Sequence, residues 1–462
     1  MALVLFYTHV IPPDVFGTYT IALAYAIFAN IFVFQWLRVG YARIAQGIDT
    51  NAAALRKAFI LGYGACALTL CAIVYPFARV YVFDGDDAVA IAATGLALAL
   101  SWFDLTTEVI RARFEPRTYC AMMVVKALLS TLCGGIVGIL GFGAAAMLLA
   151  AAAGSFFASA PGLRLVFAGF WDSRVRDGVA VGIFTYSLPL IPALAMTALA
   201  EVSDRFAISL LQGTVAAGLF AAANELPKRT IFFLMQGINV AVFPHVMRAF
   251  DTNGAKTADS QMHKGLELTV AVGLPACVGI VIASPLLAKV MFGPEYREAA
   301  SIVLPFAAVA TLINGFRAYY LDQIFQMLKK PQFIFYIAGL TLPCSWLGYF
   351  LLVPNYGLYG ASTVLLLASV ASLGMSWVVA LRFYPVRLPW LQLARVVAAV
   401  TGMAGVMLLL PAPLDLHGLA MQMAAGMAGY GLCAAALNVL NCRALVRRRA
   451  AAWLRPTGIK GA

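Results

Sequence analysis

The sequence predicts an all-α, multi-pass membrane protein with about fourteen transmembrane helices. Of its 462 residues, 63% are hydrophobic and only 11% are charged, and the mean hydropathy is +0.89. A soluble domain carries about 25% charged residues. The apolar residues also arrive in blocks of about 20, the length of helix that crosses a hydrocarbon layer about 30 Å thick. These observations exclude a soluble globular protein.

Charged residues, proline and glycine separate the apolar blocks and mark where the spans end. Residues 2–11 form only a short apolar fragment, about half the length of a span. We expect that translation starts upstream, the alternative being that the first helix is incomplete. Full-length spans are expected at residues 17–36, 58–78, 88–107, 119–140, 142–160, 179–211, 213–247, 264–291, 301–325, 332–353, 357–381, 393–411 and 418–440.

The connections between the spans are short. Fourteen spans use about 280 residues and leave about a dozen residues for each connection, whereas an extramembrane catalytic domain needs about 50 or more. Eight cysteines fall in or at the edges of spans, and the four histidines are scattered. We therefore expect no enzyme activity, no cofactor and no metal site, and a function that is carried out inside the bilayer.

The formal charge of +12 is distributed unevenly. Of the 32 lysine and arginine residues, 24 lie in alternate connections and in the C-terminal tail, and three lie on the opposite side: Arg79, Lys289 and Arg297. The positive-inside rule predicts that the basic side, with the C-terminus, is cytoplasmic. We interpret the tail arginines 447–449 as a topological anchor rather than as a site for anionic lipid or nucleic acid.

Short landmarks recur along the chain at a nearly constant offset. Gly17 and Gly218 open similar segments, Pro116 and Pro331 lie 215 residues apart, and Gly141-Phe-Gly-Ala-Ala resembles the segment that begins at Gly357. A repeat of six spans returns the chain to its starting side, which predicts two parallel lobes, 1–178 and 179–392, followed by a helix pair and basic tail, 393–462. Two such lobes around a central cavity are typical of alternating-access transporters.

Five cations fall inside predicted spans, where a charge costs about 2.5–3.5 kcal/mol or more. We predict that they line a wet cavity that binds an anion such as a phosphate group. An alternative is that they form charge pairs that fix helix packing, and the lysine nearest a span end could reach the interface instead. The five are Arg205, Lys228, Arg229, Arg317 and Lys126.

The same helices carry carboxylates and prolines. Glu201, Asp204 and Glu225 are candidates for coupling to a proton or sodium gradient, because a desolvated carboxylate changes its charge readily. The hinge candidates are Pro189, Pro192 and Pro227, and Pro227 is expected to kink a span of about 35 residues. A passive kink filled by neighbouring helices is the alternative for the first two.

Three motifs resemble those of a known family. Residues 11–19 (IPPDVFGTY) fit the pattern hydrophobic-Pro-x-x-(Phe/Tyr)-Gly-x-Tyr, which follows the first helix of polysaccharide exporters and flippases. Residues 204–213 (DRFAISLLQG), continued by 218–223 (GLFAAA), and residues 353–361 (VPNYGLYGA) complete the match. Nearly the whole chain resembles the lipid-linked oligosaccharide flippase branch of the multidrug/oligosaccharidyl-lipid/polysaccharide superfamily.

The resemblance implies translocation of an undecaprenyl-pyrophosphate-linked repeat unit across the bacterial inner membrane, for lipopolysaccharide O-antigen, capsule or exopolysaccharide assembly. The cations would then screen the pyrophosphate, and the partners would be membrane lipids, a polymerase and a chain-length regulator, with no nucleic acid. The short first helix departs from the family pattern.

Three alternatives stay open. They are a multidrug or small-molecule exporter of the same fold, a membrane polysaccharide polymerase or ligase, and a scaffold role. An exporter of cationic drugs would usually have an acidic pocket, and a polymerase would need a large outer loop, so the cation excess and the short loops favour the flippase.

Overall fold

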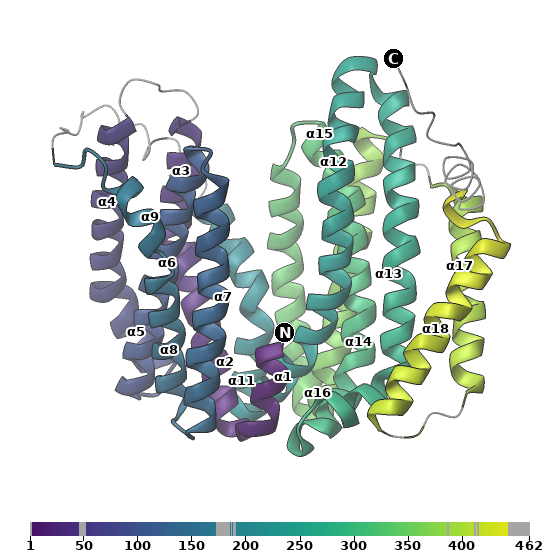
Figure 1. Cartoon of the computed structure of the whole chain (residues 1–462), viewed down its shortest axis with the longest axis horizontal. Helices are drawn as coiled ribbons and strands as arrows, with labels where there is room; N and C mark the ends of the chain where they lie inside the picture. Colours follow the sequence, from purple (N-terminus) through teal and green to yellow (C-terminus); the bar gives the residue numbers. More distant parts are fainter. Residues whose placement is uncertain are drawn as a thin grey trace, which may run out of the picture. The chain divides into compact units, whose positions relative to one another are not determined.

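Figure 1 shows the computed structural model, which describes residues 2–45, 52–171, 191–385, 388–410 and 415–441, with the single residues 185, 187 and 413. In these ranges every regular element is a helix. Ten helices are long and apolar enough to cross a membrane, or up to eleven if the bent pair α8 and α9 forms one span. The predicted all-α, multi-pass fold is confirmed.

Two of these helices are long enough to cross the membrane twice. One runs over Leu194–Thr252, 59 residues, and the other over Gln332–Phe383, 52 residues. Each contains a glycine with positive φ, Gly213 at 84° and Gly357 at 57°, where the helical backbone is interrupted. L-residues rarely adopt this conformation, which explains why glycine ends one span and begins the next at both positions.

The chain forms two compact units. Unit 1 comprises Met1–Ala222 and Ala338–Gly357, and unit 2 comprises Ala223–Ile337 and Leu358–Ala462. Two long helices, α11 (Ile191–Pro227) and α16 (Gln332–Phe383), contribute to both. The units are defined by contacts rather than by the sequence repeat, so the lobe boundaries predicted from the repeat stay a prediction.

Unit 1 contains the first half of the chain. Its α6 packs against α8, α9, α7 and α2 and is the central helix of the unit. Its helices are α1 (Ala2–Val10), α2 (Pro13–Ala29), η1 (Asn30–Phe34), α3 (Gln35–Ala45), α4 (Ala52–Thr69), η2 (Leu70–Val74), α5 (Tyr75–Tyr81), α6 (Asp87–Ala112), α7 (Pro116–Ile139), α8 (Ala144–Phe157) and α9 (Ala160–Val166).

Unit 2 is built around α13, which packs against α12, α14, α17 and α18. Its elements are η4 (Lys228–Phe232), α12 (Phe233–Asn253), α13 (Ala255–Met291), η5 (Pro294–Tyr296), α14 (Arg297–Phe316), η6 (Arg317–Leu321), α15 (Asp322–Met327), α17 (Trp390–Leu409), α18 (Leu416–Ala436) and η7 (Val439–Asn441), with the second part of α16. A buried apolar cluster in this unit includes Leu321, Ile324 and Phe325 of the η6–α15 segment.

The glycine landmarks have structural reasons. A Cβ at Gly218 would lie 2.6 Å from the Cα of Gly17, and a Cβ at Gly17 would lie 2.2 Å from the carbonyl oxygen of Thr214. The two repeat landmarks therefore touch backbone to backbone in unit 1, where no side chain fits. Gly141 and Gly357, the other glycine pair, both have positive φ and both end a span.

Candidate functional site

A partly buried polar cluster joins two helices of unit 1. The Arg38 side chain, 12% exposed, forms an ion pair with Asp104 of α6 and donates a hydrogen bond to Gln35. Asn30 Nδ2 donates to the same Asp104 Oδ2 at 2.9 Å. Asp104 thus neutralises Arg38 and accepts two donors from the helix that starts at α2. We call these four residues the unit 1 polar cluster.

A π-helical segment aligns the donors of this cluster. Asn30 and Arg38 are eight residues apart, and in a continuous α-helix their side chains would be about 80° apart around the axis. The segment η1 begins at Asn30 and makes i→i+5 hydrogen bonds, which accommodates one extra residue per bulge. The pair then behaves like residues seven apart, which lie on one face, so both side chains reach Asp104.

Lys126 of α7 lies beside the unit 1 polar cluster. Its Nζ is 4.1 Å from the ring centroid of Phe103, the residue before Asp104, and its charge interacts with Asp104 and Arg38. A cation over an aromatic face is stabilised without full hydration. Arg38 and Lys126 therefore give this region one more positive than negative charge.

The other unit 1 candidates lie on α11. Asp204 is 7% exposed, and its Oδ1 accepts the backbone N–H of Arg205 at 2.8 Å. Arg205 is half-buried and Glu201 is exposed. Pro192 lies near the beginning of α11, and Pro189 lies outside the described residues.

Unit 2 holds the second group of candidates, around the boundary between α11 and η4. Arg229 Nε donates to Glu225 Oε2 at 2.9 Å, and the two side chains are 64% and 19% exposed. Lys228 is half-buried. Pro227 has helical φ and ψ, and the π-helical segment starts at the residue after it. Because proline cannot donate the usual i→i−4 hydrogen bond, an irregular turn beside it is expected.

A second π-helical segment in unit 2 positions Arg317. Arg317 Nη1 lies 3.7 Å from Asp322 Oδ2, and among the described residues the buried Arg317 Nε and Asp322 Oδ1 have no hydrogen-bond partner. Residues five apart are about 140° apart around an α-helix, but the i→i+5 turn of η6 stacks them. Close by, Gln323 donates a hydrogen bond to Asn239 of α12.

The structure thus assigns the sequence-predicted cations to two separate groups. Lys126 and Arg205 belong to unit 1, and Lys228, Arg229 and Arg317 belong to unit 2. The pairs Glu225–Arg229 and Arg317–Asp322 are ion pairs within single helices. Their roles in ligand binding, ion coupling and hinge motion stay predictions.

The unit 1 polar cluster was not predicted from the sequence. The first full span was expected to end at residue 36, which placed Arg38 in a cytoplasmic connection. The helix in fact continues through α3 to Ala45. A signal was present: Asn30, Gln35 and Arg38 become one polar stripe once a one-residue bulge is allowed.

The fold is that of the transporters of the MOP superfamily. One similar structure is a lipid II flippase MurJ in an inward closed conformation, at 12% identity and a TM-score of 0.76, with 96% of each chain covered. Another is an inward-facing multidrug resistance MATE family transporter of the MOP superfamily, at 13% identity and a TM-score of 0.62, with 82% of this chain and 94% of that chain covered. A third is a MOP superfamily transporter from Pyrococcus furiosus, described as having a binding pocket of reverse polarity, at 14% identity and a TM-score of 0.54, with 82% and 89% covered.

Residues 8–301 match the family model described as "Polysaccharide biosynthesis protein", so the chain belongs to that family. No curated protein matches the chain in a sequence search.

Proposed function

We propose that the protein is a flippase that moves a polyprenyl-pyrophosphate-linked oligosaccharide across the bacterial inner membrane. The observation that carries the proposal is the combination of a polysaccharide biosynthesis family with a fold that matches a lipid II flippase over 96% of both chains. A polysaccharide biosynthesis protein made almost entirely of membrane helices suits a transport step better than a synthetic reaction. In this proposal the protein moves its substrate across the membrane and does not make or break covalent bonds in it.

The intramembrane cations give this proposal its physical basis. A pyrophosphate that crosses the hydrocarbon layer without counter-charges meets a large desolvation cost. Arg229 keeps 64% of its side-chain surface exposed while bound to Glu225, so its guanidinium can bind a second anion with its remaining N–H groups. Lys228, Arg317, Arg205 and Lys126 supply further charge. Alternating access would present these residues to one membrane face and then to the other.

The carboxylates beside these cations provide a route to coupling. Glu225 is bound to Arg229, so an anionic ligand that takes over this guanidinium would free the carboxylate to accept a proton or a sodium ion. Glu201 and Asp204 are the corresponding candidates in unit 1. In this proposal the basic connections and the C-terminus face the cytoplasm, and a polymerase and chain-length regulator receive the translocated unit.

Deletion of the gene in its host, with complementation, tests the function. We expect loss of surface polysaccharide and accumulation of completed lipid-linked repeat units, measured by extraction and mass spectrometry, with rescue by wild type. Arg229→Glu should insert normally but fail to rescue, because it reverses the charge that faces the pyrophosphate. Unchanged lipid pools in a host without a second flippase would contradict the proposal.

The MATE-like structures favour one second candidate, export of a small molecule. It predicts a different phenotype: the deletion would leave the lipid-linked pool intact and would raise sensitivity to a toxic compound. The same strain therefore separates the two functions.

A further inference from the structure

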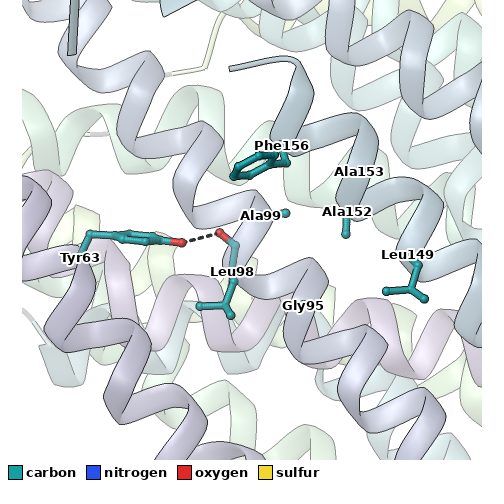
Figure 2. Close-up of a pocket in the computed structure, with 8 residues that line it drawn as sticks. All are labelled: Tyr63, Gly95, Leu98, Ala99, Leu149, Ala152, Ala153 and Phe156. Carbon is teal, nitrogen blue, oxygen red and sulfur yellow. Dashed lines mark hydrogen bonds between the residues drawn. The ribbon is translucent and has the colours of Figure 1, made fainter. Parts of the chain in front are cut away.

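Unit 1 contains an apolar cavity that the proposed function does not use. It has a volume of about 370 Å³ and lies between α4, α6 and α8. Its lining includes Tyr63, Gly95, Ala99, Ala152, Ala153 and Phe156, whose arrangement is drawn in Figure 2. Small side chains on α6 and α8 leave the space open. A cavity of this size is far larger than the volume of one water molecule, about 30 Å³.

The chemistry of the cavity selects a hydrocarbon chain. None of the lining residues is charged, and the Tyr63 hydroxyl already donates a hydrogen bond to the carbonyl oxygen of Leu98 at 2.9 Å. Leu149 and Phe156, also in the lining, are 52% exposed, as expected for side chains that face lipid. Tyr63 and Gly95 lie within helices that qualify as membrane spans, so the cavity is surrounded by lipid acyl chains rather than by water.

A row of aromatic rings leads from the cavity to a cation. Tyr63 packs against Trp102 at 5.3 Å between centroids, Trp102 against Phe167 at 6.2 Å, and Phe167 against Phe170 at 5.7 Å. Lys57 Nζ lies 5.1 Å from the centroid of Phe170. Lys57 is six residues before Tyr63 on α4, about 9 Å along the helix. Six residues also turn α4 by about 120°, so the row of rings, rather than one side of α4, connects the cavity with the cation on this face of unit 1.

Two arginines add to the positive charge at this end of the unit. Arg56, 6% exposed, donates to the carbonyl oxygen of Ala168, and Arg113 Nη1 donates to that of Leu165 at 3.1 Å. Within the described part of the chain neither guanidinium is ion-paired with a carboxylate, and Arg56 Nε is buried without a partner. Arg56 is buried, so the lack of a paired carboxylate is costly there, and a bound anion would offset this cost, whereas Arg113 is exposed and adds only its charge.

We propose that this face of unit 1 binds one anionic phospholipid of the surrounding bilayer. The phosphate lies at Lys57, within the field of Arg56 and Arg113, and one acyl chain fills the cavity beside Tyr63. Basic sites between membrane helices at the cytoplasmic side bind such head groups. The site does not depend on the proposed flippase activity.

The depth of the site favours a resident bilayer lipid over the transported one. Lys57 is five residues from the beginning of α4, about 8 Å along the helix, which suits a head group at the interface. Trp171, 84% exposed and packed on Phe170 at 5.2 Å, is the residue type that marks this level. A phosphate in transit must instead pass the middle of the membrane.

Native mass spectrometry of the full chain, stripped of lipid in detergent, tests the proposal. The probes are dioleoylphosphatidylglycerol, dioleoylphosphatidylcholine and undecaprenyl phosphate, titrated separately. We expect phosphatidylglycerol to bind about fivefold or more tightly than phosphatidylcholine, from the contact of the anionic lipid with Lys57. Lys57→Gln should remove this preference, whereas Arg43→Gln, an exposed cation of α3 in the same unit, should leave it unchanged.

Two substitutions with the same change in size test the cavity. A Cβ at Gly95 or at Gly64 meets no atom within 4 Å, so both positions have room where a side chain begins, but only Gly95 lines the cavity. Gly95→Leu should weaken binding of both phospholipids about tenfold by displacing part of the chain, and Gly64→Leu should not. Ala153→Leu, on α8, provides a second filled cavity, and thermal unfolding confirms that each variant is folded.

Three results would overturn the proposal. They are equal binding of the two phospholipids by wild type, undiminished binding by both folded cavity variants, or undecaprenyl phosphate as the probe that binds most tightly and is lost on filling the cavity. The last result would assign the cavity to the transported lipid, whatever the outcome of the gene deletion.

Discussion

Helices that are equivalent in the predicted repeat are held together by different contacts in the two units. In unit 1 the helix that contains η1 is bound to α6 by a charged pair, Arg38–Asp104. In unit 2 the helix that contains η4 is bound to α15 by a neutral pair, Asn239–Gln323. The charges of unit 2 are instead paired within single helices, as Glu225–Arg229 and Arg317–Asp322.

The exposure of the two arginine side chains indicates which of them can bind a ligand. The Arg38 side chain is 12% exposed, and its two Nη groups are bound to Asp104 and Gln35. The Arg229 side chain is 64% exposed and bound to one carboxylate. We infer that Arg38 mainly holds helices together, whereas Arg229 is available to an anion. Three sets of substitutions test this difference between the units.

The largest expected effect is on stability in unit 1. Asp104→Ala leaves the largely buried Arg38 without its counter-ion, and because the Asp104 side chain is 32% exposed the cost in unfolding free energy should be about 3 kcal/mol, the lower end of the range for a buried pair. Asn239→Ala in unit 2 removes a neutral hydrogen bond and should cost only about 1 kcal/mol. Thermal unfolding of the purified variants in detergent measures both.

A double variant is the control for this prediction. Arg38→Met combined with Asp104→Leu removes both charges of the pair and should recover part of the lost stability, because the arginine that would lack its counter-ion is also removed, while Asn30 and Lys126 still lose their contact with Asp104. If Asp104→Ala were no more damaging than Asn239→Ala, the scaffold role of the charged pair would be wrong.

The second prediction separates stability from transport. Arg229→Gln should lower the translocation rate about tenfold, from the loss of a charge-assisted contact with phosphate, and leave the melting temperature unchanged. Arg38→Gln should lower the melting temperature. Both are measured on the same purified protein, and a melting temperature that falls equally in the two variants would remove the distinction.

The third prediction compares two close glycine contacts. A Cβ at Gly17 in unit 1 meets the backbone of Thr214, whereas a Cβ at Gly315 in unit 2 meets the flexible side chain of Met235, 2.5 Å from its sulfur. Gly17→Ala should therefore cost about 1–3 kcal/mol and Gly315→Ala less, because methionine can adopt another rotamer. If the two substitutions lowered the unfolding free energy equally, as measured by thermal unfolding, the backbone contact at Gly17 would adjust as easily as the side-chain contact at Gly315, contrary to the prediction.

Hydropathy and glycine landmarks predicted most of the fold. The transmembrane character follows from apolar blocks of the right length, and Gly213 and Gly357 interrupt the helices close to the expected breaks between spans. The polar contacts were harder to predict, because each depends on helix register. One extra residue at η1 turns Arg38 toward Asp104, and η6 turns Arg317 toward Asp322. No characteristic residue pattern marks where a π-helical segment occurs, so these pairs could not be predicted from the sequence and were found only in the structure.

Translocation of a lipid-linked oligosaccharide by this protein is tested most directly in proteoliposomes. The protein is reconstituted with a short polyprenyl pyrophosphate that carries an oligosaccharide, and the fraction of lipid reached by an external glycosidase is followed over time. The proposal predicts that wild type exposes the inner-leaflet substrate much faster than Arg229→Gln or protein-free liposomes. Equal rates for wild type and protein-free liposomes, under every proton and sodium gradient applied, would contradict it.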